Sequence, residues 1–337
     1  MLIQRQTADT VKTYVLSGFD DLRLGPDLWT TLLEHGDTDV IFLTWQWQRI
    51  WWDTYGRGKL LLIVAEREGK IMALAPFFAD SGMILFIGSG ADSYYLDFLG
   101  DISDPVVLDA LLQTARECTP EFAGFEFYWV PDRSRTGQLL KESASRLRLS
   151  MNELWCLRVP ILDLALQPDA ARQATQKKSL LRHERGFHRD APLEISHIHE
   201  GDTVLSYLPE YFAQHISRWD AISVQSRFLD ARNRQFYERV TRLAAENGWL
   251  RFMRIGWQER SIAFHFGFRY RQSYLYYQPS FAIEIAGRSP GEVLLRQLLL
   301  AAIAEQADVF DLGPGEQTYK FRFATRIGHV SGYGLYR

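Results

Sequence analysis

Cysteine is scarce in this sequence, which contains two among its 337 residues, at Cys118 and Cys156. Two cysteines that far apart offer neither the spacing of a metal site nor a disulfide framework. Long apolar runs are also missing: no stretch approaches about 18 residues without a charge, so we expect no transmembrane helix. The N-terminus lacks a basic start followed by an apolar run, so we expect no signal peptide and, by default, a cytoplasmic location.

Neither sign of charge dominates, because 38 Lys and Arg residues face 41 Asp and Glu residues and the net charge is −3. A chain so close to neutral has no overall electrostatic attraction for nucleic acid or for an anionic membrane. Metal ligands do not cluster either, since His197 and His199 alone are too few for Mg²⁺ or Zn²⁺. We therefore expect no metal and no tightly bound cofactor.

What is present is an ordinary globular balance of 47% hydrophobic and 23% charged residues, in a length that suggests two domains or one large one. Aromatic residues are abundant, and several gather in one predicted helix. This helix begins after Thr44, a suitable N-cap, and ends at Gly56. Trp47 and Trp51 share one face of it. That face is either part of a core or an aromatic wall for a ligand.

A strand–helix–strand unit stands out in the second half of the sequence. Residues 273–277 are rich in strand-favouring residues, and residues 292–306 contain no Gly or Pro and are apolar around most of the helix surface. Ser289 and Pro290 suit the cap and the first position of this helix. A short apolar strand and a Gly-Pro-Gly turn follow. Such a crossover predicts parallel strands, with the helix start at one end of the sheet, where anions bind.

The order hairpin, strand, helix, strand occurs twice along the chain. The first predicted hairpin has a charged tip at residues 66–70, and the second has its tip at residues 258–260. We therefore predict two copies of one fold, at residues 1–165 and 166–337, with the donor site in the second copy. A single mixed sheet with coincidental repetition is the alternative.

A basic segment lies between the two copies, at residues 171–192, and is predicted to be helical up to Gly186. Its cations are either a solvated helix face or contacts for a phosphate or an anionic substrate. We take Lys177 and Arg182 as candidate substrate contacts. Trp219, at the end of the next aromatic helix, joins them as a candidate.

Four segments in order carry a family resemblance: SIAFHFGF, YLYYQPSF, SPGEVLL and FDLGPGEQTYKFRF. They resemble the GNAT acyltransferase superfamily, in the branch of CelD-like proteins linked to bacterial cellulose and exopolysaccharide loci. That branch is similar to the FemAB-type tandem acyltransferases. The resemblance is strongest from about Lys177 to Thr325, and EQTYKFRF is its most specific segment.

The resemblance implies an α/β fold with an α+β mixed sheet, arranged as tandem GNAT-like acyltransferase domains. It implies transfer of an acyl group from acyl-CoA, as co-substrate, to an amine or hydroxyl of a small metabolite or glycan precursor. The backbone of the aromatic strand would hold the donor carbonyl, which makes Tyr276 a candidate donor contact. The family's phosphate loop corresponds to the turn in which Arg288 and Gly291 match, with Ser289 between them, and Lys320 is a further candidate phosphate contact.

Acyl transfer needs a base for the acceptor and an acid for the leaving thiolate. His265 and Asp311 are candidate bases, although His265 suits a structural role and Asp311 suits a cap on the following turn. Tyr277 and Tyr319 are candidate acids, although strand tyrosines usually serve packing.

Residues 319–323 alternate between polar and aromatic side chains, which predicts a half-buried strand with Lys320 and Arg322 on its polar face. These two cations would hold an acidic acceptor or the donor phosphate, or else be solvated edge charges. Glu316 and Arg322 complete the candidate acceptor contacts. Two other functions stay open: a donor carried by tRNA or by an acyl-carrier protein, and a non-catalytic accessory role in polysaccharide assembly.

Overall fold

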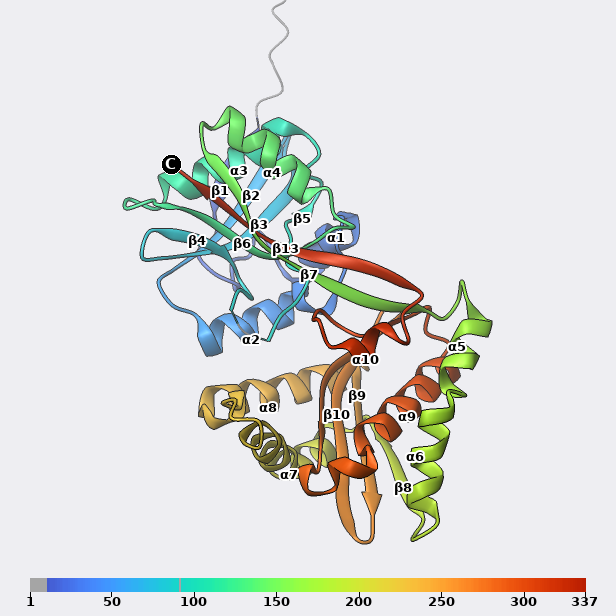
Figure 1. Cartoon of the computed structure of the whole chain (residues 1–337). Helices are drawn as coiled ribbons and strands as arrows, with labels where there is room; N and C mark the ends of the chain where they lie inside the picture. Colours follow the sequence, from blue (N-terminus) through green and yellow to red (C-terminus); the bar gives the residue numbers. More distant parts are fainter. Residues whose placement is uncertain (1–10, 91) are drawn as a thin grey trace, which may run out of the picture. The chain divides into compact units, whose positions relative to one another are not determined.

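The computed structural model describes residues 11–90 and 92–337, which divide into two compact units (Figure 1). The first unit comprises the described residues up to Leu157 together with Gly328–Arg337, and the second comprises Arg158–Ile327. The predicted division after residue 165 lies later in the chain than this one, and Gly328–Arg337, which the prediction places in the second copy, group here with the first unit. The prediction about a signal peptide concerns the N-terminus, of which residues 1–10 lie outside the described part. Both units are mixed α/β, as predicted.

The first unit contains a mixed sheet with the strand order β1-β2-β3-β4-β6-β13. All of its neighbours are antiparallel except β4 and β6, and the short β5 pairs with β3. The strands are β1 (Lys12–Val15), β2 (Lys59–Arg67), β3 (Lys70–Asp80), β4 (Met83–Phe86), β5 (Leu99–Gly100), β6 (Gly124–Pro131) and β13 (Arg326–Tyr336).

Helices α3 and α4 pack together, and α3 lies on strands β1, β2 and β3. Helix α2 begins as predicted, because the Thr44 side chain accepts the Trp47 backbone N–H at 3.3 Å. Trp47 and Trp51 are 0% and 3% exposed, so their face of α2 belongs to the core. The helices are α1 (Pro26–His35), η1 (Ile41–Leu43), α2 (Trp45–Tyr55), α3 (Pro105–Glu117) and α4 (Thr136–Arg146).

The second unit contains a sheet with the strand order β7-β12-β11-β10-β9-β8. The pair β11 and β12 is parallel, as the crossover predicts, and its other neighbours are antiparallel. The strands are β7 (Ser150–Asp163), which begins in the first unit, β8 (Leu193–Ile198), β9 (Leu250–Trp257), β10 (Arg260–Tyr270), β11 (Ser273–Phe281) and β12 (Val309–Asp311).

Helices cover both faces of this sheet (Figure 1). On one face, Phe264 and Phe266 of β10 contact Tyr211 of α7 and Tyr237 of α8. On the other face, α5, α6 and α9 share a core with β9, β10 and β11. The helices are α5 (Pro168–Thr175), α6 (Lys178–His188), α7 (Gly201–Asp220), η2 (Arg227–Leu229), α8 (Ala231–Glu246), η3 (Ile283–Arg288), α9 (Pro290–Ala304) and α10 (Thr318–Phe321).

One predicted helix differs in detail. The basic segment forms two helices, α5 and α6, rather than one. Within residues 11–90 and 92–337, no helix is both long enough and apolar enough to cross a membrane.

Candidate active site

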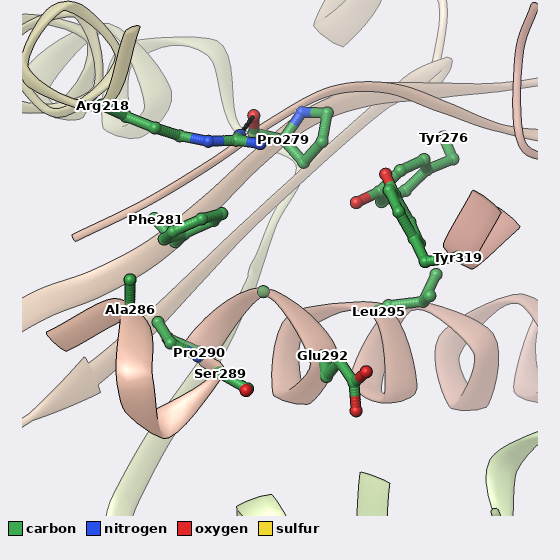
Figure 2. A pocket seen from close by; sticks show the side chains of 11 residues that line it. Arg218, Tyr276, Pro279, Phe281, Ala286, Ser289, Pro290, Glu292, Leu295 and Tyr319 are labelled. Atoms are coloured by element: carbon green, nitrogen blue, oxygen red, sulfur yellow. Dashed lines mark hydrogen bonds between the residues drawn. The ribbon is translucent and has the colours of Figure 1, made fainter. Parts of the chain in front are cut away.

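A pocket opens in the second unit where β11 continues past the end of its pairing with β12 (Figure 2). The described pairing between the two strands stops at Leu275 and Asp311, whereas β11 runs on to Phe281. The pocket has a volume of about 250 Å³. Its walls come from α7, β11, η3, α9 and α10: Arg218, Tyr276, Pro279, Phe281, Ala286, Ser289, Pro290, Gly291, Glu292, Leu295 and Tyr319.

The pocket is polar at its two ends and apolar between them. Figure 2 shows the hydroxyl groups of Tyr276 and Tyr319 close together at one end, and the Arg218 side chain extending past Phe281 to Pro279. Pro279, Phe281 and Leu295 line the stretch between. A ligand that fits this pocket has a hydrogen-bonding group at one end, a mostly apolar body, and an anionic or polar group at the other end.

The two tyrosines are held in their protonated form. Burial, together with the charge and hydrogen bond of Tyr319, raises the pKa of Tyr276 well above its usual value. Burial also raises the pKa of Tyr319, although a hydrogen bond from Tyr276 and the charge of Arg218 act in the opposite direction. Both phenols can therefore donate hydrogen bonds at neutral pH, to a developing oxyanion or to a leaving thiolate.

The first turn of α9 has fewer free backbone N–H groups to bind a phosphate than a helix N-terminus at this position predicts. Pro290 has no N–H, and the N–H groups of Glu292 and Val293 both donate to the Ser289 carbonyl, at 3.1 and 3.4 Å. Ser289 itself is left-handed, with φ 59°, and its N–H donates to Ala286. Among the described residues, Gly291 has the one first-turn N–H for which no acceptor is found.

Arg288 does not reach the pocket, contrary to its predicted role at the donor phosphate. Its guanidinium pairs with Asp190 at 2.7 Å and donates to the Gly186 carbonyl at 2.7 Å. Its Cζ also lies 4.6 Å from the ring centroids of both Phe187 and Trp257. These contacts direct Arg288 to α6 and β9, away from the start of α9.

We expect Arg288→Ala to lower the free energy of unfolding by about 1–2 kcal/mol, because it removes a half-buried ion pair and two cation–π contacts. Urea denaturation measures this loss. The same variant should keep the donor affinity of the wild-type protein within about twofold. A tenfold weaker donor affinity with unchanged stability would instead support the prediction that Arg288 binds the donor phosphate.

His265 lies in the sheet and not in the pocket. It is 0% exposed, and its Nε2 accepts the backbone N–H of Tyr277 at 3.2 Å. Burial lowers its pKa to about 3. Its ring stacks on Tyr276, and a Cβ at Gly267 would come within 2.0 Å of it, so glycine is needed there. His265 is placed as a structural residue and reaches no substrate as a base.

Asp311 and Tyr277 are likewise outside the pocket lining. Asp311 accepts the Gly313 N–H at 2.8 Å and so caps the turn after β12. Tyr277 points to the opposite face of the sheet from Tyr276, and its ring contacts Phe268 and Tyr237. The structure thus brings Tyr276 and Tyr319 together and separates them from the other candidate catalytic groups.

The predicted strand at residues 319–323 is wrong, because residues 318–321 form helix α10. The helix buries Lys320 to 8% exposure, and its Nζ donates to the carbonyls of Gly313 and Pro314 at 3.4 and 3.3 Å. Burial lowers the pKa of Lys320 to about 8, although Asp311 opposes this shift. Lys320 therefore supports the Gly-Pro-Gly turn rather than lining the pocket.

The residues predicted to contact the acceptor also lie outside the pocket lining and interact with other parts of the chain. Arg322 lies 3.5 Å from Glu292 and donates to Ser179 of α6. Glu316 pairs with Arg158 of β7. The other three candidates also lie outside the pocket lining. The Nζ of Lys177 lies over the ring of Phe323, Arg182 is exposed on α6, and the indole N–H of Trp219 donates to His215.

The sequence analysis predicted four of the residues that line the pocket: Tyr276, Ser289, Gly291 and Tyr319. It did not predict the other lining residues. Arg218 is the main omission, since it is the cationic side chain among the lining residues. In the sequence, Arg218 is marked only as a cation next to Trp219 at the end of an aromatic helix. Its contacts, Pro279 and Phe281, lie on a strand far along the chain.

Residues 174–321 match a family described as "Acetyltransferase (GNAT) domain". No curated protein matches the sequence. This region contains α6 to α10 and every residue that lines the pocket.

Solved structures share the fold over most of the chain. FemX is 10% identical with a TM-score of 0.66, over 92% of this chain and 96% of FemX. L-PGS from Bacillus licheniformis is 12% identical with a TM-score of 0.54, over 86% and 90% of the two chains. A tandem GNAT protein from the clavulanic acid biosynthesis pathway is 8% identical with a TM-score of 0.53, over 96% and 98%. Residues 174–321 are therefore similar to an acetyltransferase (GNAT) domain, within a chain whose fold resembles FemX and a tandem GNAT protein.

Proposed function

We propose that the protein transfers an acyl group from a thioester donor, held in the β11–α9 pocket, to an amine or hydroxyl acceptor. The observation that carries this proposal is a pair of protonated tyrosines, buried Tyr276 and half-buried Tyr319, in a pocket within the region that matches the acetyltransferase domain. The acceptor attacks the thioester carbonyl, a C–N or C–O bond forms, and the C–S bond breaks. The acceptor loses one proton and the departing sulfur gains one.

In this reaction the tyrosines act where charge develops. Tyr276 turns its hydroxyl proton from Tyr319 to the carbonyl oxygen as that oxygen becomes an oxyanion, and Tyr319 gives its proton to the leaving thiolate. Acyl-CoA is the donor we propose first. A small metabolite or glycan precursor is the acceptor we propose, on the resemblance to CelD-like proteins alone, and the cytoplasmic location stays a prediction.

A second donor class, an acyl-carrier protein, is favoured by the outer face of α6. Residues at helical positions i, i+4, i+7 and i+11 share this face, and all are exposed cations: Lys178, Arg182, Arg185 and Arg189. None of the four has a carboxylate partner within the described part of the chain. Their stripe is complementary to an acidic protein, and electrostatic docking of that kind weakens as salt rises.

Thermal unfolding in the presence of acetyl-CoA and longer acyl-CoAs tests the proposal. We expect a rise in Tm that grows with ligand concentration, because a ligand that binds the folded state stabilises it. Turnover with a panel of amines and alcohols is measured by the release of the free thiol.

A matched pair of variants locates the ligand. Leu295→Trp fills the pocket and should abolish the rise in Tm, whereas Leu300→Trp, a half-exposed position on the same helix outside the lining, should keep it. The proposal fails if no acyl thioester changes Tm or is turned over, or if both variants respond like the wild-type protein.

A further inference from the structure

Three large apolar side chains are exposed on the connection between α7 and α8, residues 221–230, which we call the apolar loop. Ile222, Val224 and Leu229 are 60%, 44% and 52% exposed. Elsewhere in the described part of the chain, exposed large apolar side chains lie singly along the sequence: Leu22, Val106, Leu154, Leu166 and Ile327. Single exposed apolar residues are ordinary, whereas three within ten residues mark a surface that contacts another molecule.

Hydrogen bonds hold the apolar loop in place. The backbone N–H groups of Ile222 and Val224 both donate to the Trp219 carbonyl, at 3.2 and 3.0 Å. Further along the loop, the Ser226 hydroxyl lies 2.9 Å from Nδ1 of buried His215. These bonds fold the loop against the end of α7 and leave its aliphatic side chains exposed to solvent.

The charge around the apolar loop has the opposite sign to that of the whole chain. Residues 218–234 carry a net charge of +2, from four arginines and two aspartates, whereas the chain carries −3. The arginines are Arg218, Arg227, Arg232 and Arg234. Arg218 and Trp219 are half-buried at the end of α7, with the Arg218 Cζ 5.9 Å from the Trp219 ring centroid. Aliphatic side chains next to Arg and Trp are typical of segments that enter the interface of an anionic bilayer.

A lipid bilayer fits this surface better than a protein does. Leu and Val are under-represented among the residues that dominate protein–protein binding, whereas acyl chains accept aliphatic side chains without a matching pocket. A second copy of the chain would also bring two positively charged loops together, which electrostatic repulsion disfavours.

We propose that the protein binds anionic lipid bilayers through the apolar loop, with Ile222, Val224 and Leu229 in the acyl layer and the arginines among the headgroup phosphates. Arg218 also lines the pocket, where its Nη1 donates to the Pro279 carbonyl at 2.9 Å. A loop bound to lipid therefore holds this wall of the pocket at the membrane surface. The inference does not depend on the transferase reaction, because residues 221–230 take no part in it.

Sedimentation of the whole chain with lipid vesicles tests the inference. Vesicles of phosphatidylcholine alone are compared with vesicles of equal parts phosphatidylcholine and phosphatidylglycerol. We expect the wild-type protein to partition about tenfold more strongly into the anionic vesicles, because the headgroups attract the positive charge of residues 218–234. Added salt should weaken this preference. No binding to the anionic vesicles, or equal binding to both kinds, would overturn the inference.

A double variant locates the contact. Ile222→Ser combined with Val224→Ser should partition into the anionic vesicles at least tenfold more weakly, because it removes two of the three apolar side chains that leave water. Both positions are exposed, so the Tm should stay that of the wild-type protein. Leu166→Ser replaces an 82% exposed side chain outside the loop and should bind vesicles normally. Unchanged binding of the double variant, or an equal loss in Leu166→Ser, would contradict the proposed contact.

Sedimentation velocity without lipid distinguishes a bilayer from a second copy of the chain. We expect the wild-type protein and the double variant to have the same oligomeric state. A wild-type dimer that the double variant loses would assign the apolar loop to self-association and refute its assignment to lipid. Vesicle binding that depends on the loop supports the inference even if no thioester is turned over, since binding and turnover are measured separately.

Discussion

Acidification from pH 7 to pH 4.5 is expected to lower the free energy of unfolding by about 3 kcal/mol for each of two buried histidines. His265 is 0% exposed and His215 is 3% exposed. Burial lowers the pKa of both to about 3, and the charges of Arg227 and Arg218 add to the shift at His215. Both rings are also fixed as acceptors, since Nε2 of His265 binds the Tyr277 N–H and Nε2 of His215 binds the Trp219 indole N–H.

The direction of this effect follows from the two states. An unfolded histidine has a pKa of about 6.5, so above that pH both states are neutral and the histidines contribute no pH dependence. Below it the unfolded chain takes up protons that the folded chain refuses until about pH 3. Stability from these groups is therefore complete above pH 6.5 and falls steadily as the pH is lowered toward 3.

Urea denaturation between pH 4.5 and 7.5 measures the effect. Glutamine at either buried position removes the titration, so His265→Gln and His215→Gln should each show a shallower decline than the wild-type protein. His188→Gln, at an exposed position of α6, is the control and should keep the full decline. A decline in both buried-site variants as steep as that of the wild-type protein would show that these rings do not cause it.

Replacement of Tyr319 by Phe is expected to lower kcat about 100-fold with an alkyl thioester and to leave KM within about twofold. The substitution removes the proton that the leaving thiolate needs and preserves the ring that lines the pocket. An aryl thioester releases a thiolate of much lower basicity. With that donor we expect a loss of less than about threefold, because protonation no longer limits the step.

The comparison between the two donors distinguishes acid catalysis from a packing defect. Tyr207→Phe, a tyrosine of α7 whose ring lies beneath Arg254, is the matched control and should turn over both donors normally. An equal loss with both thioesters would assign Tyr319 to positioning. An unchanged kcat with the alkyl donor would remove it from the reaction.

Local signals predicted the bounds of several elements. Thr44 and Gly56 bound α2 as expected, because capping depends on a few neighbouring residues. Helix α9 begins at Pro290 as expected, although Ser289 is left-handed and its side chain makes no capping hydrogen bond. The parallel pairing of β11 and β12 also follows from the intervening helix. The fold class was therefore accessible from sequence.

Two features of the sequence led to wrong predictions: patterns that extend over few residues, and long side chains that can reach several elements. Alternation over residues 319–323 is too brief to separate a strand from one helical turn, and α10 is that turn. Arg288 lies next to the expected phosphate site, but its reach allowed it to find Asp190 and two rings on other elements. Arg218 went unnoticed because Pro279 and Phe281, which orient it, are distant in sequence.

Strand β13 gives the chain a particular order of assembly during synthesis. β6 pairs with β4 on one side and with β13 on the other, yet β13 is made about 200 residues after β6. At the ribosome's pace of roughly 5–20 residues per second, one edge of β6 waits for some 10–40 s. For that time the nascent first unit presents an unpaired strand edge, a template for association with other chains. The sheet of the first unit is completed only after β13 has been synthesised.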